Sequence, residues 1–256
     1  MSAMAFMQCL VMCIFLISGG TTTAAATSRP EPIIELPAGV GEDHWYCESW
    51  KLAVENNNAG PWDQETCEDF AKSYMTDYRY LSDSMAVASY AREYAVSVNV
   101  THRDAWIFDI DDTLLSRVSY CDELSVKSAG FKNCKNSSLD DDDFDLPSLP
   151  ASLQLYKTIQ KLGFKIFLIS ERKQSQLNNT VKNLCKVGYN NWDKLILRDT
   201  CDEDKSSLVF KSEKRIEVVE EGYILQGNCG DQWSDLLGYA TAVRSFKFPN
   251  LMYYTK

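Results

Sequence analysis

The sequence predicts an α/β fold with a mostly parallel β-sheet and an N-terminal extension of helices. From residue 99 onward, short apolar runs alternate with stretches of helical periodicity, as in strands joined by crossover helices. Residues 43–98 repeat apolar and aromatic side chains every three or four positions, which indicates two or three helices with a break near 56–60. The chain has 256 residues, 45% hydrophobic and 24% charged, which is typical of a folded globular protein.

The N-terminal segment is expected to lie outside this fold. Residues 1–26 carry no charged side chain, and the apolar run from Ala5 to Ile17 is followed by small residues up to Ala26. This pattern predicts a secretory signal peptide, because the run is shorter than the roughly 20 residues that span a bilayer. The alternative is an uncleaved membrane anchor. We therefore expect export through the secretory pathway, no membrane association of the mature chain, a flexible segment at 27–42 and one domain at 43–256.

The elements of the predicted domain follow from the positions of the apolar runs. The candidate strands are 105–110, 164–169, 194–197 and 223–226, with a further candidate at 244–248. The candidate helices between them are 153–162, 174–187 and 212–221. Residues 115–150 are polar and contain the acidic run Asp140 to Asp143, which lacks the ligand spacing of an EF-hand. We expect a solvated loop there, bordering the ligand crevice because it follows the first strand.

Cysteine usage agrees with an oxidising compartment. The chain has nine cysteines, of which Cys9 and Cys13 lie in the predicted signal peptide. The odd number that remains predicts up to three disulfides and one free thiol, and the connectivity stays open. Pairing of sequence neighbours is favoured: Cys47–Cys67, Cys121–Cys134 and Cys185–Cys201, with Cys229 free. Asn-X-Ser/Thr glycosylation sequons begin at Asn99, Asn136 and Asn178.

The charge balance and the motif content exclude several classes of function. With 26 basic and 36 acidic residues the net charge is -10, which repels a phosphate backbone, so we expect no nucleic-acid partner. The sequence contains no Gly-x-Ser-x-Gly elbow of a serine hydrolase and no Gly-x-Gly-x-x-Gly dinucleotide turn.

The most informative stretch runs from Trp106 to Thr113. An apolar run there delivers Asp109 and Asp111 at the carboxyl end of a predicted strand, where α/β sheets bind ligands. Two buried like charges require a compensating cation, and a hard divalent metal such as Mg²⁺ prefers oxygen ligands. The alternative is an acidic turn in which Asp112 and Thr113 cap the next element.

Three later segments add chemistry at strand ends. Ser170 ends a second strand, Lys211 is expected just before a helix, and Asp231 and Asp235 follow another strand. In this order the segments resemble the four motifs of the haloacid dehalogenase-like phosphatases.

A narrower resemblance covers roughly Cys47 to Pro249. The segments that carry it are Cys47-Glu48-Ser49-Trp50, 108–116, 149–152, 211–215 and 230–236. They resemble the plant acid phosphatase and vegetative storage protein family. The resemblance implies a Rossmann-like three-layer sandwich, a cap-like insertion at 115–150, a small phosphomonoester substrate and a vacuolar or extracellular location. It also implies two alternatives, an active acid phosphatase or a nitrogen reserve with weak phosphatase activity.

The resemblance assigns roles to individual residues. Asp109 would be the nucleophile that forms an aspartyl-phosphate, and Asp111 the acid and base. Thr113, Ser170 and Lys211 would bind the phosphoryl group, with Lys214 and Arg215 as alternatives to Lys211. Mg²⁺ would be held by Asp109, Asp231, the backbone carbonyl of Asp111 and, through its waters, Asp235.

One residue departs from the family pattern. Glu171 follows the hydroxyl residue where many relatives have glycine, and we expect its side chain to point to solvent. Retention of every charged motif residue favours the enzyme over the storage protein. The substrate stays open, as does association into a homodimer.

Overall fold

The computed structural model describes residues 42–58, 64–118 and 145–253. The predicted signal peptide, almost all of segment 27–42, Cys121, Cys134, Asn136 and the acidic run Asp140 to Asp143 lie outside these residues. Within them, no helix combines the length and apolar character that a membrane crossing requires.

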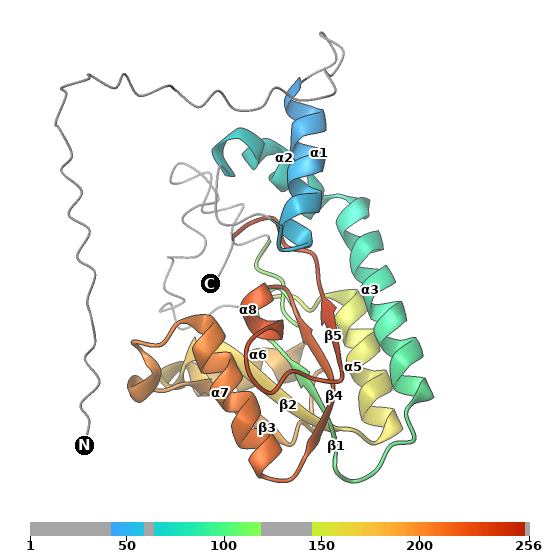
Figure 1. The fold of residues 1–256 in the computed structure, drawn as a ribbon, viewed down its shortest axis with the longest axis vertical. Helices are drawn as coiled ribbons and strands as arrows, with labels where there is room; N and C mark the ends of the chain where they lie inside the picture. The colour runs from blue at the N-terminus through green and yellow to red at the C-terminus, as the bar shows by residue number, and fades with distance from the viewer. Residues whose placement is uncertain (1–41, 59–63, 119–144, 254–256) are drawn as a thin grey trace, which may run out of the picture. The chain divides into compact units, whose positions relative to one another are not determined.

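The centre of the fold is a five-stranded sheet in the order β3-β2-β1-β4-β5 (Figure 1). The strands are β1 (Asp104–Phe108), β2 (Lys165–Lys173), β3 (Lys194–Arg198), β4 (Ile224–Gly230) and β5 (Arg244–Lys247). All four pairings between neighbouring strands are parallel. The parallel α/β prediction is therefore confirmed, including the strand near residue 244. The chain order reverses beside β1, and this reversal creates a crevice at the carboxyl ends of β1 and β4.

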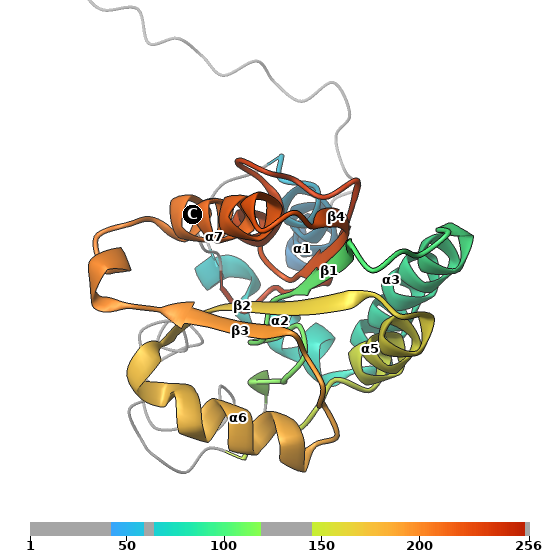
Figure 2. The same ribbon diagram turned by 90° about the horizontal axis from the view of Figure 1, so that it is seen from below.

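The two faces of the sheet bury different residues, because successive side chains of a strand point to opposite faces. Trp106 and Phe108 pack in one apolar cluster, and Ala105 and Ile107 in another. The helices that cover these faces are α3 (Tyr78–Ser97), α5 (Pro150–Leu162) and α6 (Leu177–Lys186) on the first, and α7 (Ser207–Glu220) on the second. Figure 2 shows the sheet between these two helical layers. This is the expected three-layer sandwich.

Close packing requires glycine at one position in the sheet. A Cβ at Gly227 would lie 2.4 Å from the Trp106 ring, so only glycine lets the indole lie flat against β4. Trp106 also stacks on Phe246 of β5, with ring centroids 5.7 Å apart. The β1–β4–β5 half of the sheet is thereby held around one buried indole.

The N-terminal extension forms its own apolar cluster. Helices α1 (Glu42–Glu55) and α2 (Gln64–Thr76) are linked by the Cys47–Cys67 disulfide, which confirms that predicted pairing. Trp50 and Tyr74 pack there with Leu251 and Met252 near the C-terminus. The first and last described parts of the chain are thus in contact.

The structure corrects the predicted helix 212–221. Helix α7 begins at Ser207, because the hydroxyl of Ser206 accepts a hydrogen bond from the Val209 amide and caps the helix. Lys211 therefore lies inside the helix and not before it. The other short elements are α8 (Trp233–Leu236) and 3-10 turns at Gln174–Gln176 and Thr200–Asp202.

The predicted Cys185–Cys201 disulfide is wrong in this structure. Both thiols are free and exposed. Cys185 lies in α6, which leads into β3, and Cys201 follows β3, so the length of this strand separates the two residues. A five-residue strand spans roughly 16 Å, and a disulfide requires Cα atoms within about 7 Å.

We predict three classes of cysteine in native protein. A neutral thiol reagent should modify Cys185 and Cys201 rapidly, whereas Cys229 should react only on unfolding, because burial raises its pKa to about 12. Mass mapping of an unreduced digest should recover the Cys47 and Cys67 peptides joined. A joined Cys185–Cys201 pair would contradict the described arrangement.

Candidate active site

The candidate site is built where β1 and β4 end side by side. Asp109 follows β1, and its amide donates to the carbonyl of Cys229 over 2.9 Å, which extends the pairing of the two strands. Asp231 follows the last residue of β4. Asp235 lies in the short helix α8 that comes next. The local sequence of each strand end therefore delivers carboxylates to one crevice.

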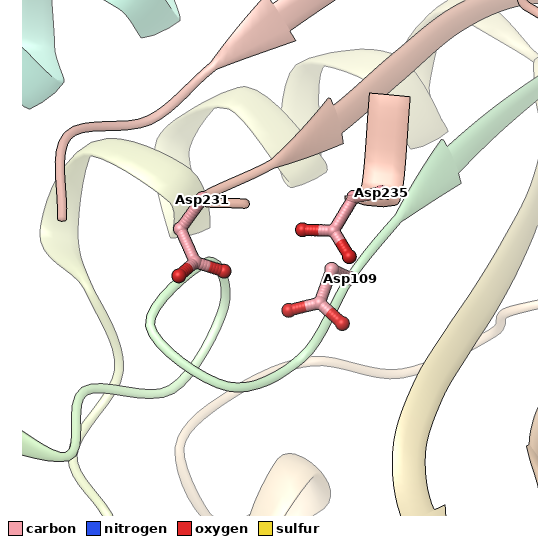
Figure 3. A group of neighbouring side chains, drawn as sticks. All are labelled: Asp109, Asp231 and Asp235. Carbon is pink, nitrogen blue, oxygen red and sulfur yellow. The ribbon is translucent and has the colours of Figure 1, made fainter. Parts of the chain in front are cut away.

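Asp109, Asp231 and Asp235 form one buried cluster. One carboxylate oxygen from each lies within 4.8 Å of the other two. Figure 3 shows the three side chains converging from the end of β1, the end of β4 and α8. Gly230 permits this approach, because a Cβ there would lie 2.4 Å from the Cβ of Asp235. The Gln232 amide also donates to Asp235 over 2.9 Å, which fixes that carboxylate.

A single ammonium group opposes the three carboxylates. Lys211 Nζ donates to Asp109 and to the carbonyl of Ile169 and lies 3.0 Å from Asp235. Burial nevertheless raises the pKa of Asp109 well above its usual range, against the opposing effect of Lys211. Burial and the neighbouring carboxylates raise the pKa of Asp231 to about 7. The cluster is therefore short of positive charge.

This donor set fits a hard divalent cation. Three buried carboxylates offer only oxygen ligands, which Mg²⁺ prefers. Its two positive charges would offset the negative charge that Lys211 leaves unbalanced. Donors from other elements already orient Asp231. It accepts from the Thr113 hydroxyl over 3.2 Å, from Gln232 over 2.8 Å and from Asn250 over 2.6 Å.

Asp111 lies beside this cluster with a partner of its own. The guanidinium of Arg172 donates to both of its carboxylate oxygens, over 2.9 and 2.7 Å. Burial raises the pKa of Asp111, but the ion pair with Arg172 outweighs this effect and holds the pKa below its usual value. Asp111 is thus ionised in this arrangement, whereas Asp109 and Asp231 resist ionisation.

Asp112 turns the chain away from the site. It adopts a positive φ of 59° and accepts hydrogen bonds from the amide and the guanidinium of Arg117. Tyr253 also donates to it over 2.7 Å, and the Arg117 guanidinium lies 4.6 Å from the centre of the Tyr253 ring. Asp112 thus has the turn-stabilising role of the alternative considered from sequence, an acidic turn. Asp109 and Asp111 instead face the crevice.

These residues border a cavity of about 190 Å³. Its walls are acidic and hydroxyl-bearing side chains with one amide and one cation: Asp109, Asp111, Arg117, Glu171, Ser207, Asp231, Gln232, Ser234, Asp235 and Tyr253. The expectation that Glu171 points to solvent holds only in part. Its side chain is 37% exposed but also borders this cavity. An ion pair with Arg198 over 2.6 Å compensates its negative charge.

The phosphoryl-binding candidates lie deeper in the fold. Ser170 and Thr113 are fully buried, and Lys211 nearly so. Their predicted contact with substrate stays a prediction. Among the alternatives to Lys211, Lys214 pairs with Glu217, and Arg215 donates to backbone carbonyls including those of Asp235 and Leu237. Only Lys211 of these three contacts Asp109 in the described structure.

Several residues at the site were not predicted. Arg172 lies beyond the predicted strand 164–169, because β2 continues past Ser170 to Lys173. Its position two residues after Ser170 is the local signal that could have found it. Arg117, Asn250 and Tyr253 carry no such local signal. Each reaches the site through a loop or through the path of the C-terminal segment.

Comparison with known proteins agrees with this geometry. Residues 35–256 match the family model described as HAD superfamily, subfamily IIIB (acid phosphatase). Acid phosphatase 1 of Solanum lycopersicum is 42% identical over 247 residues, covering 92% of this chain and 94% of that protein. Vegetative storage protein 1 of Arabidopsis thaliana is 34% identical and covers 84% of this chain and 81% of its own length.

The fold also matches a solved bacterial structure. The class C acid phosphatase from Bacillus anthracis superposes with a TM-score of 0.57, covering 81% of this chain and 86% of that chain. The two sequences are 20% identical, so this likeness concerns the fold alone.

We predict that pH and Mg²⁺ affect stability together. The pKa values of Asp109 and Asp231 are raised in the folded chain, so it binds more protons than the unfolded chain between about pH 4 and 7. Metal-free protein should therefore lose stability as pH rises through this window. Mg²⁺ at 100 times its Kd at about pH 7 should add about 2.7 kcal/mol to the free energy of unfolding at that pH. The same Mg²⁺ concentration should add less at about pH 5, because Mg²⁺ binds ionised carboxylates.

Thermal unfolding of chelator-treated protein with and without Mg²⁺ at both pH values measures this. An Asp231→Asn variant should lose most of the Mg²⁺ response. An equal Tm shift at both pH values, or none, would contradict the metal-site assignment.

Proposed function

Because this chain belongs to subfamily IIIB of the HAD superfamily, the acid phosphatases, we propose that it hydrolyses small phosphomonoesters through an aspartyl-phosphate on Asp109 with the help of Mg²⁺. The observation that carries the proposal is the division of charge at the site, where a carboxylate cluster stands beside a separate Asp111–Arg172 ion pair. Asp109 belongs to a buried carboxylate cluster suited to a cation, whereas Asp111, two residues later, stands apart with an arginine. A nucleophile and a separate acid–base group need this division.

The first step would form the covalent intermediate. A carboxylate oxygen of Asp109 attacks phosphorus, the new P–O bond forms, and the ester P–O bond to the leaving group breaks. The protonated carboxyl of Asp111 gives its proton to the departing oxygen. Lys211, already bonded to Asp109, holds that nucleophile and offers positive charge to the phosphoryl oxygens.

The second step would reverse the role of Asp111. Its carboxylate takes a proton from water, the water oxygen bonds to phosphorus, and the bond to Asp109 breaks to release phosphate. The carboxylates of Asp109, Asp231 and Asp235 and the backbone carbonyl of Asp111 would hold Mg²⁺, which when bound neutralises charge on the phosphoryl group. Ser170 and Thr113 would orient this group.

The compartment proposed for this reaction is the secretory pathway, with a vacuolar or extracellular destination. The apolar, uncharged segment 1–26 supports it. A reserve protein with weak activity is the second candidate, because relatives include vegetative storage proteins. A kcat/KM below the range of about 10⁴–10⁸ M⁻¹s⁻¹ by many decades on every phosphomonoester would favour the reserve role.

We predict that Asp109→Asn abolishes phosphatase activity while the protein stays folded. The substitution removes the nucleophile with little change in volume, so kcat should fall roughly 10⁴-fold or more. Asp111→Asn should lose about 10²–10⁴-fold through loss of the acid–base group. The matched control is Glu221→Gln, an exposed carboxylate at the opposite end of the sheet, which should retain full activity. Turnover by folded Asp109→Asn at the wild-type rate would refute the mechanism.

We predict that activity rises as pH falls from neutral. The pKa of Asp111 lies below its usual value, so at neutral pH almost all of it is ionised. The protonated fraction of Asp111 needed for the first step therefore grows about tenfold with each unit of acidification, and activity follows it while bound Mg²⁺ keeps Asp109 and Asp231 ionised. The pH profile of kcat/KM with a poor leaving group and saturating Mg²⁺ measures this. A profile that rises toward alkaline pH would contradict Asp111 as the acid.

A further inference from the structure

Asp111 depends on one side chain for its orientation. The donors to its carboxylate in the described structure are Nε and Nη2 of Arg172, over 2.9 and 2.7 Å. The side chains are only 8% and 15% exposed, for Arg172 and Asp111 respectively. Such a two-bond fork fixes the plane of a carboxylate as well as its position.

Arg172 is itself held on two sides. Its Nη1 donates to the hydroxyl of Thr180, a fully buried residue of α6, over 3.2 Å. Its backbone amide donates to the hydroxyl of Ser170 over 3.2 Å. Thr180 therefore holds the guanidinium and Ser170 holds the backbone of Arg172 near the end of β2.

The other nearby cations are bound elsewhere. Arg117 donates to Asp112, and Lys211 donates to Asp109 and Ile169. Neither forms a hydrogen bond with Asp111 in the described residues. Without Arg172, Asp111 would keep the longer-range attraction of Arg117 and Lys211 but lose both hydrogen bonds that fix the orientation of its carboxylate.

We infer that Arg172 is a positioning residue, held by Thr180, that aims the Asp111 carboxyl at the leaving-group oxygen. The inference rests on the proposed function, because it gives Asp111 the acid–base role. In the first step the proton passes from Asp111 to that oxygen as the ester P–O bond breaks and the Asp109–P bond forms. Arg172 stabilises the carboxylate that this transfer leaves behind.

Leaving-group chemistry separates this role from a general structural one. An alkoxide leaves poorly without a proton, whereas p-nitrophenolate leaves readily without one. Damage to proton delivery should therefore harm alkyl phosphates selectively. A site that is merely distorted should lose activity on both substrates alike.

The test compares kcat/KM, which reports the first step, on an alkyl phosphate and on p-nitrophenyl phosphate. Arg172→Lys keeps the charge and removes the fork. We expect a loss of about 10²-fold on the alkyl substrate and less than about tenfold on the nitrophenyl ester. Equal losses on both, or no loss on either, would overturn the inference.

Thr180→Val keeps the ion pair and gives a second test if Arg172→Lys fails to fold. It removes one hydrogen bond, so about a fivefold loss confined to the alkyl substrate is expected. Thr180→Ser keeps the hydroxyl and should behave as wild type. Because Thr180 completes a sequon, Asn178→Gln serves as the control for glycan loss. An unchanged kcat/KM of Thr180→Val on the alkyl phosphate would count against the anchoring role.

The outcomes also separate the two proposals. Wild-type protein that is inactive on both esters would contradict the proposed function, and this inference with it. Wild-type activity that requires Asp109, combined with a uniform loss in Arg172→Lys, would contradict this inference alone.

Discussion

The site contains three buried carboxylates beside one ammonium group, and the surrounding structure must stabilise this excess of negative charge. Burial of like charge is costly, and among the described residues the cation paired with this cluster of Asp109, Asp231 and Asp235 is Lys211, through Asp109 and Asp235. Packing and hydrogen bonds from the surrounding residues hold these three carboxylates together. Arg215 and Asn228 both donate to the backbone carbonyl of Asp235, which anchors the turn into α8. The glycine before Asp231 leaves the space that this turn requires.

The neighbouring acids differ, because each of them is paired with a cation. Asp112 is buried and Asp111 is partly buried in the loop after β1, yet each has its own arginine, Arg117 or Arg172. Charge is therefore balanced pair by pair on one side of the crevice and left in excess on the other. A site that is negative only where a cation would bind can hold a phosphoryl group between that cation and the paired acids.

Local sequence pattern predicted the fold class and the carboxylates of the site. The parallel α/β fold follows from apolar runs that alternate with helical stretches, and the carboxylates follow from their place after those runs. Lys211 was identified but placed before its helix, because the capping role of Ser206 was not recognised. The proposed Cys185–Cys201 bridge was wrong because pairing by sequence order ignored the strand between the two residues. Asn250 and Tyr253 could not be found, since only the tertiary path of the C-terminal segment brings them to Asp231 and Asp112.

That path has a consequence for biosynthesis. The side-chain amide of Asn250 donates to Asp231, and its backbone amide donates to Glu55 of α1. The segment near residue 250 therefore joins the N-terminal helices to the crevice. Synthesis proceeds from the N-terminus, so α1, β1 and β4 are made before this segment. Without Asn250 the acids at the strand ends lack part of their hydrogen-bonding shell. A product truncated between β5 and Asn250 would therefore keep every strand of the described sheet but lack a complete site.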